Sequence, residues 1–169
     1  MAEITSRERL QPSLLDRLTD NAPESRREGF DQQTLTFPQL RQAVLRDLAW
    51  LLNTTDLATT DDLTAMPLAL KSTINYGVPG LAGLASTSRR LKSIETAIVD
   101  AIRSFEPRIK PATLAVRLRE SEHARATPTI TFEIEGELWA LPVPEQLFLE
   151  TSIELETRHT VVTETRERR

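Results

Sequence analysis

Few residues of this chain have the types and spacing that enzymes use for chemistry. The 169 residues include no cysteine, which excludes thiolate metal sites, disulfides and cysteine nucleophiles. The two histidines, His123 and His159, form no metal-ligand motif, and we interpret both as surface residues. Gly77, Gly80 and Gly83 are spaced like phosphate-loop glycines but lack the lysine–Ser/Thr signature, so a turn is the better interpretation. The sequence therefore predicts no catalytic residue, no metal and no cofactor.

Carboxylates are abundant, with 25 Asp and Glu against 21 Lys and Arg and a net charge of −4. Two carboxylic acids about 5–10 Å apart would be able to cleave a glycosidic bond. Such a pair needs two acids in different environments, which abundance alone does not provide. A lysozyme-like muramidase is therefore kept only as an alternative function.

Basic residues gather in one part of the chain. Residues 89–119 contain eight basic and three acidic residues, although the whole chain is acidic. This asymmetry favours docking to an oppositely charged protein surface, and a solvated face is the alternative. Arg89, Arg90 and Lys92 lie at the start of a predicted helix, where the helix dipole disfavours cations. Either that helix begins earlier, or these three residues bind a partner. Phe105 is the only aromatic residue of the stretch, so no nucleic-acid stacking platform is expected.

The order of periodicities predicts helices first and strands afterwards. Apolar residues at spacings of three and four predict helices, and strict alternation after Pro107 predicts amphipathic strands. We expect an α+β fold with N-terminal helices packed on one face of a mainly antiparallel C-terminal sheet. The predicted helices span residues 12–18, 37–52, 67–73 and 88–105, and the predicted strands span 114–119, 130–135 and 147–156.

The predicted organisation is a single domain. Residues 1–11 are expected to form a flexible N-terminal arm, residues 12–162 the domain, and residues 163–169 a frayed tail. No apolar run is long enough to span a bilayer, and the N-terminus lacks the apolar segment of a secretory signal. We expect a cytoplasmic protein that does not insert into the membrane.

Two short segments have strong local chemistry. The first is a structural turn, in which Gly77 permits positive φ. The second lies where the longest predicted helix stops, because Pro107 disfavours helical geometry in the residue before it. The turn consists of Asn75, Tyr76 and Gly77, and the segment after the helix of Glu106, Pro107 and Arg108.

Glu106-Pro107-Arg108 resembles the Glu-Pro-Arg signature of the gp25-like family of contractile-tail baseplate proteins. Residues 13–18, 72–79 and 133–157 resemble the N-terminal helix, the Asn-Tyr-Gly turn and the C-terminal strands of its type VI secretion branch, the TssE proteins. Each motif is weak alone, but their order and spacing are specific, and together they cover about residues 10–160.

The resemblance implies a structural wedge component of a type VI secretion baseplate and no enzyme. Its implied partners are the wedge proteins TssF and TssG, with TssK and the sheath as further candidates. It implies a role in starting sheath assembly, at the cytoplasmic side of the inner membrane, with no nucleic acid and no small-molecule substrate. An anti-adaptor that uses the same fold to bind a response regulator is the alternative.

Two surfaces are expected to bind these partners. At the first, Pro107 fixes the backbone, Arg108 pairs with a carboxylate of the partner, and Glu106 either binds the partner or orients Arg108. We expect Arg108→Ala to abolish assembly and to leave the fold intact. The second is an open strand edge between residues 147 and 161, whose alternative is a paired interior strand. The predicted edge residues are Leu149, Thr151, Ile153 and Leu155.

Overall fold

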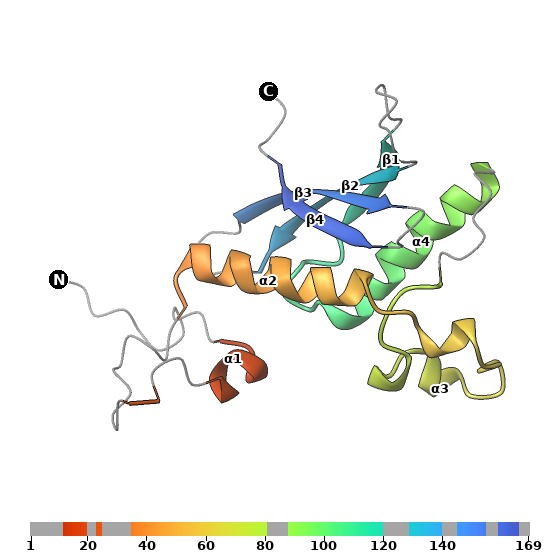
Figure 1. Cartoon of the computed structure of the whole chain (residues 1–169), viewed down its shortest axis with the longest axis horizontal. Helices are drawn as coiled ribbons and strands as arrows, with labels where there is room; N and C mark the ends of the chain where they lie inside the picture. The colour runs from red at the N-terminus through yellow and green to blue at the C-terminus, as the bar shows by residue number, and fades with distance from the viewer. Residues whose placement is uncertain are drawn as a thin grey trace.

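The computed structural model describes residues 12–19, 23–24, 35–80, 88–119, 129–139, 145–154 and 159–165. Helices precede strands in the chain, and the strands form one antiparallel sheet, so the predicted α+β class is confirmed (Figure 1). The helices are α1 (Leu14–Leu18), α2 (Phe37–Leu52), α3 (Pro67–Leu70) and α4 (Ser88–Phe105), with the 3₁₀ helices η2 (Leu57–Thr59) and η3 (Thr73–Asn75). The strands are β1 (Ala115–Arg119), β2 (Thr129–Leu138), β3 (Glu145–Glu154) and β4 (Thr160–Glu164).

The sheet has the order β1-β2-β3-β4, and one of its faces is covered by the two long helices. Figure 1 shows α2 and α4 on the same side of the sheet, where α2 packs against β4 and α4 against β1. Successive side chains of a strand point to opposite faces, so alternate residues enter the core. Phe132, Ile134 and Leu149 are the central examples, each at most 2% exposed.

Helix α2 begins and ends where its sequence provides caps. The backbone N–H of Thr36 donates to Oε1 of Gln39 over 2.8 Å, and a proline occupies the first turn. Leu40, Val44 and Leu48 then recur at helical spacing and are buried against the sheet. The side chain of Asn53, just beyond the last residue, donates back to the carbonyl of Ala49 over 2.7 Å.

Helix α4 has the predicted bounds and the predicted apolar face. Ile94, Ile98 and Ile102 are buried, and the helix ends at Phe105, two residues before Pro107. It begins at Ser88 with no acidic residue in its first turn. Residues 81–87 lie outside the described part of the chain.

The predicted strand edge is wrong in its position. The stretch from 147 to 161 contains the end of one strand and the beginning of the next, and β3 pairs with β2 on one side and β4 on the other. Leu149, Thr151 and Ile153 therefore lie in an interior strand, and Leu155 lies outside the described residues. Alternation in a sequence identifies a strand but does not identify its neighbours, which are set by the topology of the whole sheet.

The ends of the domain are described in part. Residues 1–11 and 166–169 lie outside the described residues, and β4 runs to Glu164, into the tail that we expected to fray. Among the described helices, none combines the length and apolarity that crossing a bilayer requires.

Candidate functional site

The segment after α4 forms a corner whose backbone is held by the end of β2. The N–H of Glu106 still bonds to the carbonyl of Ile102, over 2.8 Å. Beyond Pro107, the carbonyl of Arg108 accepts from the N–H of Trp139 over 2.6 Å, and Ile109 bridges to Leu138. We call Glu106, Pro107 and Arg108 the corner. Its position is fixed by one helix and one strand.

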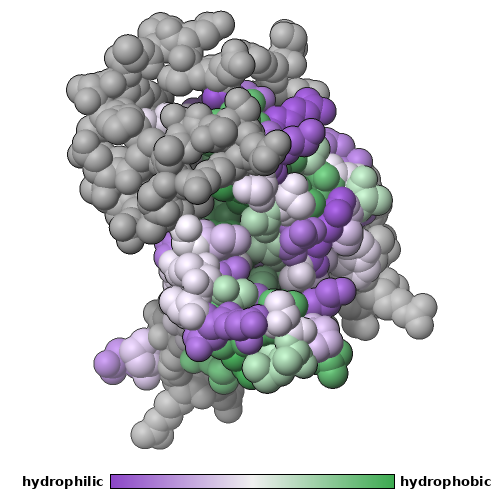
Figure 2. All heavy atoms as spheres, turned by 90° about the vertical axis from the view of Figure 1, so that its right-hand side faces the viewer, coloured by the Kyte–Doolittle hydropathy of each residue, from purple (hydrophilic) through white to green (hydrophobic). Residues whose placement is uncertain are grey.

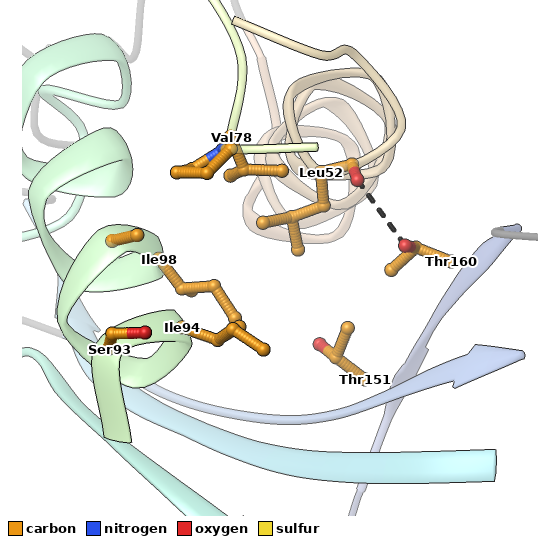
Figure 3. Close-up of a pocket in the computed structure, with 9 residues that line it drawn as sticks. Leu52, Val78, Ser93, Ile94, Ile98, Thr151 and Thr160 are labelled. Atoms are coloured by element: carbon orange, nitrogen blue, oxygen red, sulfur yellow. Dashed lines mark hydrogen bonds between the residues drawn. The ribbon is translucent and has the colours of Figure 1, made fainter. Parts of the chain in front are cut away.

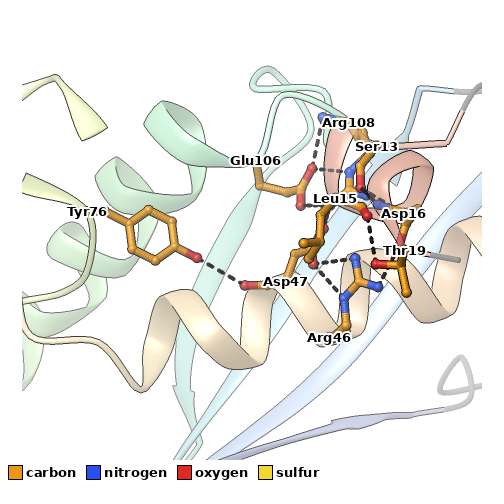
Figure 4. Close-up of polar contacts among 9 residues, drawn as sticks. All are labelled: Ser13, Leu15, Asp16, Thr19, Arg46, Asp47, Tyr76, Glu106 and Arg108. Carbon is orange, nitrogen blue, oxygen red and sulfur yellow. Dashed lines mark hydrogen bonds and ion pairs between the residues drawn. The ribbon is translucent and has the colours of Figure 1, made fainter. Parts of the chain in front are cut away.

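The charged side chains of the corner bind one another. Nε of Arg108 donates to Oε1 of Glu106 over 2.6 Å, and Nη2 forms an ion pair with Oε2 of the same carboxylate (Figure 4). The backbone N–H of Arg108 also donates to Oε1 of Glu106, over 3.1 Å. Nη2 reaches Oδ2 of Asp47, in the middle of α2, over 2.6 Å. Of the two roles that we left open for Glu106, its geometry is that of a residue that orients Arg108.

Burial makes this ion pair a structural element. Glu106 is 3% exposed, and the side chain of Arg108 is 22% exposed. Burial acts to lower the pKa of Arg108, but the hydrogen bonds and charges of Glu106 and Asp47 outweigh it, so the pKa is raised. Nη1 of Arg108 is buried without a hydrogen-bond partner in the described part of the chain. The guanidinium therefore has no exposed fork for a partner carboxylate, contrary to our expectation from the sequence.

A second arginine extends the network to α1. Arg46 contacts Oδ1 of Asp47 over 2.8 Å and Oδ1 of Asp16 over 2.6 Å (Figure 4). Ser13, at the N-cap of α1, donates to Oδ2 of Asp16 over 2.7 Å. The hydrogen bond from Arg46 is the main cause that lowers the pKa of Asp16. Alternating charges thus join α1, α2 and the corner.

The predicted turn is present and contacts the same network. Gly77 has a φ of 137°, and a Cβ there would lie 2.5 Å from the carbonyl oxygen of Thr54. Tyr76 packs edge-on against Phe105 with ring centroids 5.2 Å apart, and its hydroxyl lies 3.5 Å from the carbonyl oxygen of Asp47. Burial, followed by the charges of Asp47 and Glu106, raises the pKa of Tyr76. The turn therefore braces the end of α4.

The predicted basic residues lie at the other end of α4. Lys92 is exposed, and the side chains of Arg89 and Arg90 lie outside the described part of the structure. Because a helix rises about 1.5 Å per residue, the first turn of α4 is roughly 25 Å from the corner. The basic cluster and the corner are therefore two separate surfaces.

The described lining of the cavity between the two long helices and the sheet lacks the side chains that acid–base or metal chemistry requires. A cavity of about 140 Å³ lies between α2, α4 and the sheet, lined by residues that include Leu52, Val78, Ile94, Ile98, Thr151 and Thr160 (Figure 3). None of the described residues that line it has an ionisable side chain. Within the same described ranges, no three His, Asp or Glu side chains are grouped to hold a metal ion.

Two residues that contact the corner were missed by sequence reasoning. Asp47 is 61 residues from its partner Arg108, and nothing local to α2 marks it as an ion-pair residue. Trp139 is 64% exposed beside the corner, at the end of β2. An aromatic residue directly after an alternating strand is a signal that was available for Trp139.

The family model of baseplate wedge protein gp25 matches residues 38–143, more than half of the chain. The chain belongs to the gp25 family. The match includes α2, the turn, α4, the corner and β2, so the whole charged network except α1 lies inside it. Searches of curated proteins and of solved structures gave no match. As a gp25-family protein, the chain is a structural component of the baseplate of a contractile injection system.

Proposed function

We propose that this gp25-family chain is the TssE-type wedge subunit of a type VI secretion baseplate, that it binds TssF and TssG, and that it helps to start the sheath. The family match supports the baseplate role. The resemblance of residues 13–18, 72–79 and 133–157 to the TssE proteins supports the type VI assignment. The working location is the cytoplasmic side of the inner membrane, and TssK is a further candidate partner.

The corner is the proposed wedge contact, but the roles of its residues differ from those expected from the sequence. Glu106 and Asp47 hold Arg108 in place, so the arginine shapes the surface and does not supply a free charge. Pro107 and Trp139 are both exposed, and the N–H of Trp139 bonds to the carbonyl of Arg108. Tryptophan is enriched among the residues that dominate binding energy at interfaces. We therefore place the anchor of the wedge contact at Trp139.

Trp139→Ala tests this anchor with a matched control. We expect the variant to fold normally and to lose co-purification with TssF and TssG. Trp50→Ala is the control, because Trp50 is also exposed, at 51%, but lies on α2 over Arg46. If the wild type and Trp139→Ala retain both wedge proteins equally, the corner is not part of the wedge contact. Failure of the wild-type chain to bind either protein would reject the type VI assignment itself.

The sheath contact is proposed at β4 in place of the interior β3. The N–H of Thr165 bonds to the carbonyl of Phe148, so residues 161 and 163 also face β3 in the alternating ladder. The backbone groups of Thr160, Val162 and Glu164 then point outward. The side chain of Asn53 already bonds to the backbone of Thr160. It donates to the carbonyl over 2.9 Å and accepts from the N–H over 2.9 Å. Within the described residues, the outward backbone groups of Val162 and Glu164 are left for an added strand, and Asn53 sets where that strand stops.

Proline substitutions test the edge one hydrogen bond at a time. Val162→Pro removes an outward N–H and should block sheath growth while the sheet remains folded. Thr163→Pro removes an inward N–H and should instead separate β4 from β3. Amide hydrogen exchange reports folding, and electron microscopy reports sheath formation. Normal sheaths with Val162→Pro would exclude strand addition at this edge.

The basic residues at the start of α4 are proposed as a third contact, for an acidic partner surface. Helix α4 begins at Ser88, so Arg89, Arg90 and Lys92 stay at the end of the helix dipole that disfavours cations. A sequence selected for helix stability alone would place acids there. Replacing all three by Gln should strengthen the helix slightly and weaken wedge assembly, as measured by thermal unfolding and co-purification.

Two other functions are separated from this one by direct assays. A muramidase would release soluble fragments from peptidoglycan, and we expect no release above a buffer control. An anti-adaptor would co-purify with a response regulator, and we expect wedge proteins instead. Mass spectrometry of proteins bound to the tagged chain in cells distinguishes an anti-adaptor from a wedge subunit.

A further inference from the structure

Residues 54–80 form a lobe that leaves four large hydrophobic side chains exposed to solvent. Met66 is 52% exposed, Leu68 87%, Leu70 39% and Ile74 69%. Single exposed apolar residues are ordinary, but four within nine positions form a patch. Figure 1 shows the lobe around α3 projecting away from the sheet, and Figure 2 shows hydrophobic residues gathered at the lower end of the same side.

The lobe is folded, so the exposure is not a result of loose structure. Its two ends pair, because the N–H of Val78 donates to Thr54 over 2.9 Å and that of Asp56 donates to Val78 over 3.0 Å. The buried amide of Asn75 accepts from the N–H of Ala58 over 2.9 Å and donates to the carbonyl of Leu70 over 3.1 Å. Leu63 fills the interior at 5% exposure. A surface that is ordered in advance loses little entropy on binding.

The lobe carries a net negative charge. Residues 54–80 contain three aspartates, Asp56, Asp61 and Asp62, against one cation, Lys71. Asp61 and Asp62 accept from the neighbouring Thr60 and Thr64, and no cation of the described chain pairs with them. A complementary surface is therefore apolar with a basic rim. An anionic membrane would repel the aspartates, and a two-fold contact with a second copy would bring like charges together.

We propose that this lobe docks on an apolar surface of another protein, whose rim carries lysine or arginine. Leu68 and Ile74 supply the apolar anchors, and Asp61 and Asp62 select the basic rim. The lobe thus adds a docking surface to the corner and the β4 edge. The proposal does not depend on which contractile machine the chain serves.

Two synthetic amphipathic helices of equal length test the chemistry, one of leucine and lysine and one of leucine and glutamate. Binding to the full-length protein is measured by fluorescence anisotropy. We expect the lysine helix to bind at least about tenfold more tightly, and Leu68→Ser to weaken it by about tenfold. Combining Asp61→Asn with Asp62→Asn should reduce the preference for lysine. Leu14→Ser is the matched control, because Leu14 is 72% exposed but lies on α1.

Several results would overturn the proposal. They are equal binding of both helices, no binding of either, and binding that Leu68→Ser leaves unchanged while circular dichroism shows a folded variant. Sedimentation velocity tests whether the lobe binds a second copy of the chain. Flotation with phosphatidylserine-containing vesicles tests whether it binds lipid. Self-association or vesicle binding that Leu68→Ser abolishes would assign the lobe to a second copy or to lipid, and the proposal would be wrong.

Discussion

The corner and the lobe of residues 54–80 depart from the usual distribution of residues in opposite ways. The corner buries a carboxylate, Glu106 at 3% exposure, whereas the lobe leaves Leu68 87% exposed. At the corner the chain supplies the opposite charge itself, from Arg108, which Asp47 of α2 also holds in place. At the lobe the described chain supplies nothing to cover the leucine. The difference teaches that the buried charges of the corner form an internal joint, whereas the exposed apolar surface of the lobe is where we propose a partner.

The largest expected effect is at the joint. Arg108→Ala leaves the buried Glu106 without its cation and should lower the free energy of unfolding by about 3–5 kcal/mol. Urea denaturation measures this loss. Arg103→Ala, an exposed arginine on α4, should change stability by less than about 0.5 kcal/mol. This predicted loss of stability replaces our expectation from the sequence that Arg108→Ala leaves the fold intact. A loss in the free energy of unfolding below about 1 kcal/mol would support the original expectation instead.

The second prediction compares two apolar residues directly. Ile102 is fully buried, and truncation to alanine should cost about 2–5 kcal/mol because it leaves a cavity. Leu68→Ala should change the free energy of unfolding by no more than about 0.5 kcal/mol. Thermal unfolding of both variants is the measurement. A large loss with Leu68→Ala would show that the lobe is covered within the isolated chain.

The third prediction concerns the rigidity of the lobe. Gly77→Ala should cost about 1–3 kcal/mol, since alanine meets positive φ and the carbonyl of Thr54 together. Hydrogen exchange should accelerate across residues 54–80 and little elsewhere. In Gly80→Ala the new methyl would meet the side chains of Thr59 and Thr55 and no backbone atom, so a smaller effect is expected. If hydrogen exchange of the lobe is equally slow in the wild type and in Gly77→Ala, then Gly77 is not needed to close the lobe.

The smallest expected effect is at the outer end of the charged network. The lowered pKa of Asp16 means that its ion pair with Arg46 stabilises the fold above the ordinary carboxyl pKa of 3.8, and that this contribution is lost as pH falls through the lower folded value. Asp16→Asn should reduce stability at pH 7 by about 0.2–1 kcal/mol. The difference between variant and wild type should vanish near pH 2. A difference that persists there would have a cause other than ionisation.

Much of the fold was predictable because its periodicities are clean. Ile94, Ile98 and Ile102 repeat at helical spacing, and the alternation after Pro107 identifies the sheet strands. Proline placed the end of α4 correctly. The position of β3 inside the sheet was not predictable, because alternation is the same in an interior strand and in an edge strand with one buried face.

The candidate site was predictable in location and not in its chemistry. The sequence identified the corner of Glu106, Pro107 and Arg108 as a unit. It did not identify Asp47 of α2, which binds Arg108 and makes it part of an internal network. A contact across 61 residues leaves no periodic trace in a single sequence. The exposure of Leu68 was also hidden, since a leucine in a short helix looks the same whether it faces a core or water.

The ties between α2 and β4 have a mechanical consequence. Arg41, near the start of α2, pairs with Glu164 at the end of β4, and Asn53 at the other end of the helix pairs with Thr160. The outermost strand is thus fastened at both ends to a helical rod about 24 Å long. Tension applied to that strand would pass along the rod to Asp47 and into the corner. With the proposed contacts, a pull by the sheath on β4 would be transmitted to the wedge partners at the corner.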